Sequence, residues 1–368
     1  MKRLCVIYNF PQKYRSAIFK LIDKEWDSDW YFGDNRTDIR GFDLSILKST
    51  KEIKNIKLLG PLTYQIGIPS LLFRRTYDTY LMLGDLNCLS TWIILLLHKC
   101  INRKKKIYLW SHGWYGREGV IKKFLKRIFF GASDGVFLYG QYAKECMSLE
   151  GFDSTRLFVI HNSLDYEEQK RLRLKIDNTT VYRDHFNNKN PNIIFIGRLT
   201  KVKRIDLLIE SVARLAEEGF NVNVTLVGDG TERDKLELLA KERNVIDRVW
   251  FYGACYDDSR NSELIYNADL CVAPGNVGLT AMHTMAFGTP VLTHNNFPMQ
   301  MPEFEAICAG KTGDFFNYDD LDSLTNQIKA WLQKHGKERE EIRKQCIDVI
   351  EDSWNPDYQI NVLKENLK

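Results

Sequence analysis

The sequence predicts an α/β protein with two domains of similar size, each built on a doubly wound parallel sheet, which face each other across a cleft. Short apolar runs that end in Gly, Pro or a polar turn alternate with helical patterns along the chain, and this alternation is typical of parallel sheets. The length of 368 residues also favours two domains, because one hydrophobic core rarely covers so long a chain.

The alternation is clearest in the second half, where we predict a C-terminal domain over residues 190–353. Its expected strands are the apolar runs 192–198, 222–230, 248–253, 269–275 and 289–294. Helical patterns lie between them, and the apolar positions of the first pattern share one helical face. Ligands of such sheets bind outside the carboxyl ends of the strands, so the loops after these runs form the candidate site.

The first half shows the same pattern less clearly, and we predict an N-terminal domain over residues 1–175. Its expected strands are the runs 3–10, 79–85, 106–113, 135–140 and 156–163. The polar stretch 177–192 is interpreted as the linker between the domains. The final helix, 354–368, is expected to pack back on the first domain.

Composition narrows the class of protein. Hydrophobic residues make up 44% and charged residues 27%, as in soluble globular proteins. A net charge of +4 gives no reason to expect a nucleic-acid partner. The eight cysteines form no CxxC pair, so we expect a reducing, cytoplasmic compartment. Without GxGxxG after the first strand, GxxxxGK[ST] or GxSxG, the sequence also argues against dinucleotide enzymes, P-loop ATPases and α/β-hydrolases.

Paired acidic residues could suggest a metal-binding DxD motif. Asp257-Asp258, Asp319-Asp320 and Asp320-x-Asp322 are each better interpreted as a turn or helix cap ahead of a helical pattern. No pair of carboxylates is placed by the predicted fold as a glycosidase requires. We therefore expect neither a metal ion nor a cofactor.

Two strand ends carry residues that suit an anion. Gly197 ends one expected strand, Arg198 follows it, and Lys203 lies five residues further on. Arg can grip two phosphate oxygens, and Lys adds a point charge. On a second strand end, the loop 276–279 leads into a helix, and Gly278 would let an anion approach the backbone closely. Two cations and a helix N-terminus in one place fit a diphosphate.

These segments resemble the C-terminal domain of family 4 glycosyltransferases. The resemblance rests on IFIGRLTKVKRIDLLIES, TLVGDG, VWFYG and PGNVGLTAMHTMAFGTPV, and it is strong over about residues 190–330. It implies two Rossmann-like domains of the GT-B type, a nucleotide-sugar donor held by the second domain, and metal-independent transfer with retention of configuration. By position, it also implies which groups hold the donor diphosphate: Arg198, Lys203 and the amides of Val277, Gly278 and Leu279. Gly197 is assigned to the donor site as well.

The sequence departs from this family at one point. The family has a Glu-x7-Glu pattern whose acids address the donor sugar and the ribose, whereas here the two positions hold Gly275 and His283. A neutral His can form one hydrogen bond to a ribose hydroxyl. Packing of His283 against the sheet is an equal alternative. Because Gly275 has no side chain, recognition of the donor sugar is expected to use Asn276, Asn295 or Glu303.

The first half offers a second group of candidates. His112 ends an expected strand, and the resemblance places a His near the donor sugar at about this point, where it hydrogen-bonds the sugar or orients the acceptor. A strand-end His bound to a backbone carbonyl is the structural alternative. Gly113, Trp114 and Tyr115 follow it, and their rings are acceptor candidates because aromatic side chains stack on sugars. Arg15, in the loop after the first strand, is assigned to the same acceptor site.

A basic amphipathic segment lies in the first half. Residues 101–127 contain nine Lys or Arg and one Glu. Over 119–130, one expected helix face is apolar and the other basic; the apolar face consists of Val120, Ile121, Phe124, Leu125 and Ile128, and the basic face of Lys122, Lys123, Lys126 and Arg127. This pattern fits a helix lying in an anionic membrane surface. A helix with its apolar face toward the core is the equal alternative.

The sequence thus predicts a glycosyltransferase. The enzyme would move a sugar from a nucleoside diphosphate sugar to a hydroxyl of a glycan acceptor, during synthesis of a bacterial surface polysaccharide on a lipid carrier. It would work in the cytoplasm or on the inner face of the cell membrane. Two alternatives stay open: an inactive nucleotide-sugar-binding partner subunit, and a sugar-nucleotide epimerase or phosphorylase on the same fold.

Overall fold

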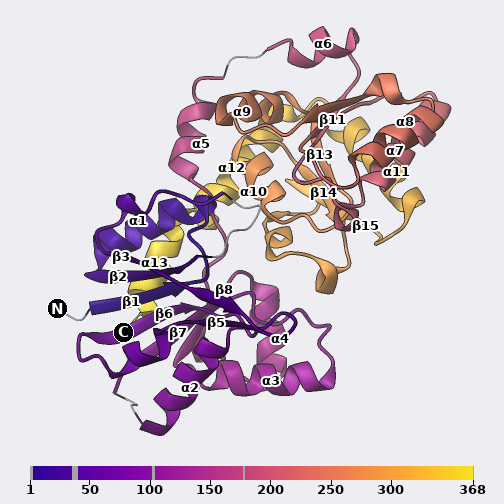
Figure 1. The fold of residues 1–368 in the computed structure, drawn as a ribbon. Helices are drawn as coiled ribbons and strands as arrows, with labels where there is room; N and C mark the ends of the chain where they lie inside the picture. Colours follow the sequence, from indigo (N-terminus) through magenta and orange to yellow (C-terminus); the bar gives the residue numbers. More distant parts are fainter. Residues whose placement is uncertain (1–2, 35–39, 102–103, 177–178, 368) are drawn as a thin grey trace. The chain divides into compact units, whose positions relative to one another are not determined.

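The computed structural model describes residues 3–34, 40–101, 104–176 and 179–367 (Figure 1). The chain divides into two compact units, the first formed by Met1–Asp165 with Asn355–Lys368 and the second by Tyr166–Trp354. Small parts of three predicted segments lie outside the described residues: 102–103 of the basic stretch, 177–178 of the predicted linker, and 368 at the end of the final helix.

The first unit is built on a parallel sheet of seven strands in the order β3-β2-β1-β6-β7-β8-β9. These strands are β1 (Arg3–Tyr8), β2 (Ser28–Gly33), β3 (Thr50–Ile53), β6 (Tyr77–Leu83), β7 (Lys106–Ser111), β8 (Gly135–Leu138) and β9 (Leu157–Val159). A separate antiparallel pair consists of β4 (Asn55–Lys57) and β5 (Thr63–Gln65). The α-helices are α1 (Ser16–Glu25), α2 (Leu89–Ile101), α3 (Val120–Gly131), α4 (Gln141–Leu149) and α13 (Pro356–Asn366). The 3₁₀ turns are η1 (Lys13–Arg15), η2 (Leu44–Ile46), η3 (Ile68–Phe73) and η4 (Ser154–Arg156).

Both faces of this sheet are covered by helices. One core layer contains Phe19 of α1 and Ile360 and Leu363 of α13. The opposite layer contains residues of α2, α3 and α4, among them Leu95 and Phe129. Helix α13 is the last helix of the chain, yet its apolar face packs in the core of the first unit. Its start is fixed because the side chain of its cap, Asn355, accepts a hydrogen bond from a backbone amide of the first turn.

The second unit is built on a parallel sheet of six strands in the order β12-β11-β10-β13-β14-β15. These strands are β10 (Asn192–Ile196), β11 (Asn223–Val227), β12 (Val249–Gly253), β13 (Leu270–Ala273), β14 (Val291–His294) and β15 (Gly313–Phe316). Its α-helices are α5 (Tyr166–Arg173), α6 (Val181–Phe186), α7 (Ile205–Glu217), α8 (Arg233–Glu242), α9 (Asp258–Asn267), α10 (Leu279–Ala286), α11 (Leu321–His335) and α12 (Arg339–Ser353). The 3₁₀ turns are η5 (Lys201–Lys203), η6 (Ile246–Arg248), η7 (Phe297–Met299) and η8 (Pro302–Ala306).

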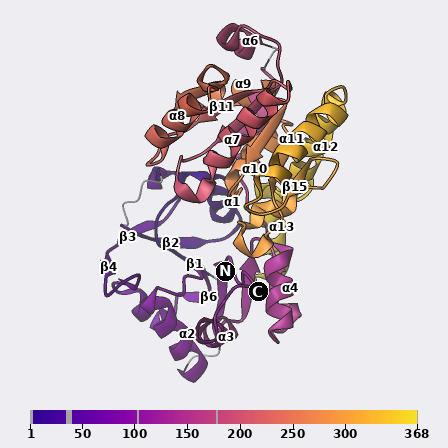
Figure 2. The same cartoon turned by 90° about the vertical axis from the view of Figure 1, so that its right-hand side faces the viewer.

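The connections of the second sheet are those of a Rossmann-like domain. Helices α7 and α8 lie side by side on one face, as Figures 1 and 2 show. The strand order proceeds outward from β10 in one direction and resumes at β13 in the other. Such a reversal leaves a crevice at the carboxyl ends of the two strands, which is where doubly wound sheets bind ligands.

The break between the units falls earlier than residue 175. Helix α5 packs with helices of the second unit, and Arg173 donates a hydrogen bond to the carbonyl of Ala286. The stretch predicted as a linker is also part of the second unit. It contains α6, whose buried Tyr182 donates a hydrogen bond to the carbonyl of Leu264 at 2.6 Å. The polar composition of this stretch therefore reflects a surface helix held by a few buried side chains.

Helix α3 does not turn its apolar face toward the core. Its predicted apolar face is exposed, with Val120 at 85%, Ile121 at 78% and Phe124 at 62% of full exposure. Lys126, predicted on the basic outer face, is instead buried, and its ammonium group lies 2.6 Å from the carboxylate of Glu118. The core contacts of α3 come from its last turn, where Phe129 and Phe130 are buried.

The packing of α13 leads to a stability prediction. Replacing buried Leu363 by Ala should lower the free energy of unfolding by roughly 2–5 kcal/mol, because a cavity would open between α13 and α1. Urea unfolding of the full chain, followed by near-ultraviolet circular dichroism, measures the change. The exposed Leu149, also in the first unit, provides the control, since Leu149→Ala should have little effect. An equal effect of the two substitutions would contradict the packing of α13.

Candidate functional site

Three loops meet at the point where the strand order of the second sheet reverses, and glycines make the close approach possible. A Cβ atom on Gly228, after β11, would stand 1.9 Å from the carbonyl oxygen of Gly197, after β10. A Cβ atom on Gly275, after β13, would stand 1.9 Å from the carbonyl oxygen of Val202. The backbone amide of Gly275 donates to the carbonyl of Lys203 at 2.9 Å. Contacts this short exclude any side chain at either glycine.

Lys203 ties two of these loops together. Its ammonium group donates to the carbonyl oxygen of Asn276 at 2.6 Å and to the side-chain oxygen of the same residue at 2.8 Å. Burial lowers the pKa of Lys203 to about 8; the nearby Glu303 carboxylate raises the pKa, and the positive charge of Arg198 lowers it further. Arg198 lies two residues after the end of β10, close to its predicted place after the strand. The structure thus brings Arg198, Lys203, Asn276 and Glu303 into one neighbourhood.

The first turn of α10 faces the same crevice. However, one of the three backbone amides predicted to bind the diphosphate already donates a hydrogen bond within the protein. The amide of Val277 donates to the side-chain oxygen of Gln300 at 3.0 Å. Gln300, which the sequence analysis missed, is fixed in turn by its bond to Thr293 at 2.8 Å. Gly278 is the helix cap, with a positive φ of 54° that favours glycine. This leaves Gly278 and Leu279 at the helix start, where amides have no partner within the helix.

The two positions that depart from the Glu-x7-Glu pattern have different environments. Gly275 lies against the backbone of η5, so a glutamate could not stand there unless that loop moved. His283 lies partly exposed on α10. Burial lowers the pKa of His283, and the carboxylate of Asp258 raises it. Of the substitutes proposed for sugar recognition, Asn295 bonds to the side chain of Asn317 at 3.0 Å.

The first unit gathers a second group of polar side chains at the carboxyl ends of β1, β7 and β8. Arg15, in η1, is 5% exposed. Its guanidinium carbon lies 5.6 Å from the ring centre of Tyr8, 5.3 Å from that of Trp110 and 5.1 Å from that of Tyr139. The sequence analysis missed these three aromatic residues. Each lies among the last four residues of an expected strand, so the rule that placed His112 would also have found them.

His112 follows β7 and lies beside this cluster, with its ring centre 4.7 Å from that of Tyr139. Burial lowers the pKa of His112 to about 4, and the positive charges of Arg15 and Lys126 lower it further. The imidazole is therefore neutral near pH 7. It can form directed hydrogen bonds but does not carry a charge at this pH.

The loop after His112 is held by the buried Lys126. The ammonium group of Lys126 donates to the carbonyl of Gly113 at 2.6 Å, and the backbone amide of Tyr115 donates to Glu118 at 2.9 Å. Trp114 is 1% exposed and belongs to the core. Its ring packs against Phe152 with centres 5.5 Å apart and contacts the ammonium group of Lys126, so it is not available to stack on a sugar, contrary to the acceptor role predicted for it. Tyr115 is partly exposed and stacks on His112 with ring centres 6.0 Å apart.

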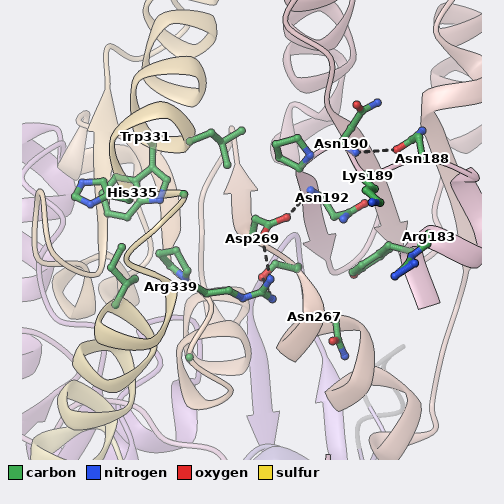
Figure 3. Close-up of a pocket in the computed structure, with 18 of the residues that line it drawn as sticks. Arg183, Asn188, Lys189, Asn190, Asn192, Asn267, Asp269, Trp331, His335 and Arg339 are labelled. Carbon is green, nitrogen blue, oxygen red and sulfur yellow. Dashed lines mark hydrogen bonds and ion pairs between the residues drawn. The ribbon is translucent and has the colours of Figure 1, made fainter. Parts of the chain in front are cut away.

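A cavity of about 420 Å³ lies on the opposite edge of the second sheet (Figure 3). It is lined by residues at the amino ends of the strands, such as Asn192 at the start of β10 and Asp269 before β13. Asp269 bonds to the backbone amide of Asn192 at 2.7 Å and pairs with Arg339 at 2.9 Å. Because these polar groups pair with one another at the edge away from the crevice, we do not assign the cavity to the functional site.

Among the described residues, no group of three or more His, Cys, Asp or Glu side chains is placed so that it could hold a metal ion. None of the described helices has both the length and the apolar character needed to cross a bilayer.

The second unit is similar in sequence to known proteins. Residues 179–348 match the model of the family "Glycosyl transferases group 1". An uncharacterized glycosyltransferase of Methanocaldococcus jannaschii is 36% identical over 103 residues, which cover 27% of this chain and 26% of that protein. The O-antigen biosynthesis glycosyltransferase WclY of Escherichia coli is 30% identical over 161 residues, 42% of each chain. The chain spans about a quarter to a half of the length of the curated relatives it matches.

Comparisons of structure extend over both units. The lipopolysaccharide outer core galactosyltransferase WaaB matches with a TM-score of 0.74 and 15% identity, over 99% of this chain and 100% of that one. The Anabaena protein HepE in complex with UDP matches with a TM-score of 0.73 and 16% identity, over 99% of each chain. The predicted fold, two Rossmann-like domains of the GT-B type, is therefore confirmed. The resemblance to glycosyltransferases is confirmed at the level of the group 1 family for residues 179–348.

The lowered pKa of Lys203 makes a testable prediction for anion binding in the second unit. A diphosphate bound beside this group would raise its pKa from about 8, so binding should take up a proton at pH 8.5. The affinity should consequently fall as the pH rises above 8. Calorimetric titration with UDP in two buffers of different ionisation enthalpy measures the proton uptake. The uptake should vanish in Lys203→Met and persist in Lys201→Met; a pH-independent affinity would contradict the prediction.

Proposed function

We propose that the protein is a glycosyltransferase that moves a sugar from a nucleoside diphosphate sugar to a hydroxyl group of a glycan acceptor. The observation that carries this proposal is the convergence of Arg198, Lys203 and the start of α10 at the switch point of the unit that matches group 1 glycosyl transferases. Positive charge and helix-terminal amides at such a point suit a diphosphate. The second unit would hold the donor and the first the acceptor.

In this proposal, catalysis rests on stabilising the leaving group. As the bond between the sugar and the diphosphate breaks, negative charge grows on the phosphate oxygen. Lys203 is held by its hydrogen bonds to Asn276, and the amides of Gly278 and Leu279 are held by the start of the helix. Together with the exposed Arg198 they would bind that charge. The residues require no metal ion for this step, and we propose transfer with retention of configuration. The departing phosphate would take the proton of the acceptor hydroxyl on the same face.

The neutral imidazole of His112 would contribute a directed hydrogen bond. It would bind a sugar hydroxyl or orient the acceptor, because a group that is uncharged near pH 7 is suited to bonding hydroxyls. His283 would form a single bond to a ribose hydroxyl. Asn276 and Glu303, both close to Lys203, are the candidates for contacts with the donor sugar.

A second candidate function follows from Gly275. The tight packing of this glycine on η5 leaves no room for the acid of the Glu-x7-Glu pattern. A protein that binds a nucleotide sugar but does not transfer it, acting as a partner subunit, would need no such acid. Transfer to any acceptor would exclude this candidate and also a sugar-nucleotide epimerase on the same fold.

The acceptor is proposed to be a growing bacterial surface glycan on a lipid carrier. Support comes from relatives whose names concern O-antigen and lipopolysaccharide, and from the surface of α3. Val120, Ile121 and Phe124 project from this helix into solvent, and the exposed Lys122 and Arg127 flank them. Apolar side chains bordered by cations fit the surface of an anionic bilayer. The protein would accordingly work peripherally on the inner face of the cell membrane.

The catalytic proposal predicts a loss of turnover on removal of either cation. Arg198→Ala or Lys203→Ala should lower the rate of sugar transfer by about a hundredfold or more, because the leaving diphosphate would lose a preorganised charge. Release of the nucleoside diphosphate in the presence of donor and acceptor measures the rate. Lys201→Ala is the matched control, since Lys201 is an exposed lysine of the same turn. Rates close to that of the native enzyme in both variants would refute the assignment.

The membrane proposal predicts binding to anionic vesicles. Vesicles of phosphatidylglycerol and phosphatidylcholine should co-sediment the protein, more weakly at high salt. Ile121→Ser with Phe124→Ser should reduce binding roughly tenfold or more, because apolar area would no longer enter the bilayer. Leu238→Ser changes an exposed leucine of α8 and should bind as the native protein does. Equal binding of native protein and the α3 variant would show that α3 is not the contact surface.

A further inference from the structure

Arg15 is a buried cation for which the described residues offer no carboxylate partner. The side chain is 5% exposed, and none of the ion pairs of the described residues includes it. One of its terminal nitrogens donates to the hydroxyl of Tyr139, while the other, Nη1, is buried without a hydrogen-bond partner among the described residues. A guanidinium keeps its charge at any physiological pH. Burying such a charge without an anion is unfavourable, so the site requires an explanation.

Further buried polar atoms around Arg15 also lack partners in the described structure. They are the hydroxyl of Tyr8, the indole nitrogen of Trp110 and Nδ1 of His112. The rings of Tyr8 and Trp110 both lie over the guanidinium, and their centres are 6.3 Å apart. An indole nitrogen can only donate, a hydroxyl can donate, and Nδ1 of a neutral imidazole donates in one tautomer. Several donors therefore surround one cation.

We propose that Arg15, Tyr8, Trp110 and His112 form a binding site for an oxyanion carried by the acceptor, a phosphate or a carboxylate group. Such a group would supply the missing negative charge and accept the unused hydrogen bonds at once. The aromatic rings stabilise the cation by cation–π contact, and Nη1 remains as an unused donor for the anion. The proposal deepens the proposed function and rests on it, because it names the acceptor as an anionic glycan or a phosphate-linked one.

The location of the cluster assigns the oxyanion to the acceptor and not to the donor. All four residues belong to the first unit, at the carboxyl ends of its strands, whereas Arg198 and Lys203 belong to the second unit. Burial holds the pKa of His112 low, and the positive charges of Arg15 and Lys126 lower it further. Because Lys126 is paired with Glu118, an anion in the cluster would balance the charge of Arg15.

The test uses the indole N–H resonance of Trp110 in the full chain, assigned through Trp110→Phe. The Lys203→Met variant serves as the background, so that phosphate bound in the second unit does not contribute. Titration with inorganic phosphate at constant ionic strength should move this resonance until it saturates, because the N–H gains an acceptor. Arg15→Met should abolish the shift, Arg15→Lys should retain part of it, and Arg127→Met, which changes an exposed arginine, should leave it unchanged.

Acetate and UDP distinguish the sources of the oxyanion. A saturating shift with phosphate or acetate supports an acceptor phosphate or carboxylate, respectively. A shift caused only by UDP, and only when Lys203 is present, would assign the anion to the donor and overturn the proposal. No shift with any of the three would overturn it too. The proposed function has its own test, because it would be contradicted if the protein neither bound UDP nor transferred a sugar. Neither result would change the response of Trp110 to phosphate.

A stability measurement separates binding from a structural role of Arg15. If the site is built for an anion, Arg15→Met should melt at the same temperature as the phosphate-free native protein or above it, because an unpaired buried charge is removed. Added phosphate should then raise the melting temperature of the native protein more than that of the variant. A variant that melts several degrees lower, with equal phosphate responses, would show that Arg15 serves packing and would overturn the proposal.

Discussion

The hydrogen bonds from Lys203 to Asn276 determine the geometry of the second unit's crevice. They join the loop after β10 to the loop after β13 across the switch point of the sheet. Burial lowers the pKa of this partly buried group, because the neutral oxygens that it bonds only partly replace water. An anionic ligand would supply the missing stabilisation. These two hydrogen bonds therefore order the loops before a ligand binds, and they leave the positive charge of Lys203 where a diphosphate would bind.

The close packing of these two loops also explains why Gly275 departs from the Glu-x7-Glu pattern. The loop that carries Lys203 passes so near β13 that only a residue without Cβ can stand there. The missing acid is thus a consequence of how the two loops pack, and the space that its side chain would need is filled by the backbone of Val202. Recognition of the donor sugar would consequently fall to side chains that approach from neighbouring turns, such as Glu303 on η8.

The sequence was sufficient to predict ten of the thirteen described strands in the two parallel sheets, because most buried parallel strands appear in the sequence as apolar runs. It missed β2, β3 and β15. Strand periodicity also predicted Arg198, Lys203 and His112 at or after strand ends, and the structure has all three in the loops that follow β10 and β7. Periodicity could not place Trp114 or α3. A helical pattern defines two faces but does not say which one is buried, and Lys126 is buried because Glu118, outside the helix, neutralises it. The amide of Val277 was misjudged for a similar reason, since its partner Gln300 is distant in sequence.

The cluster around Arg15 shows why local patterns leave such sites hidden. Its members come from η1, β1, β7 and the residue after β8, and only the parallel order of the strands brings them to one edge. Natural proteins rarely leave a buried charge and several donors unused, because each lowers the stability of the fold. Where they persist, a functional site is a common reason.

Both units therefore present positive charge at the carboxyl edge of a sheet, but by different means. In the second unit, a lysine bonded to neutral oxygens lies beside an arginine and a helix start. In the first unit, aromatic rings surround an arginine. One of its terminal nitrogens donates to a tyrosine hydroxyl, so the other, Nη1, would be the donor left for an anion.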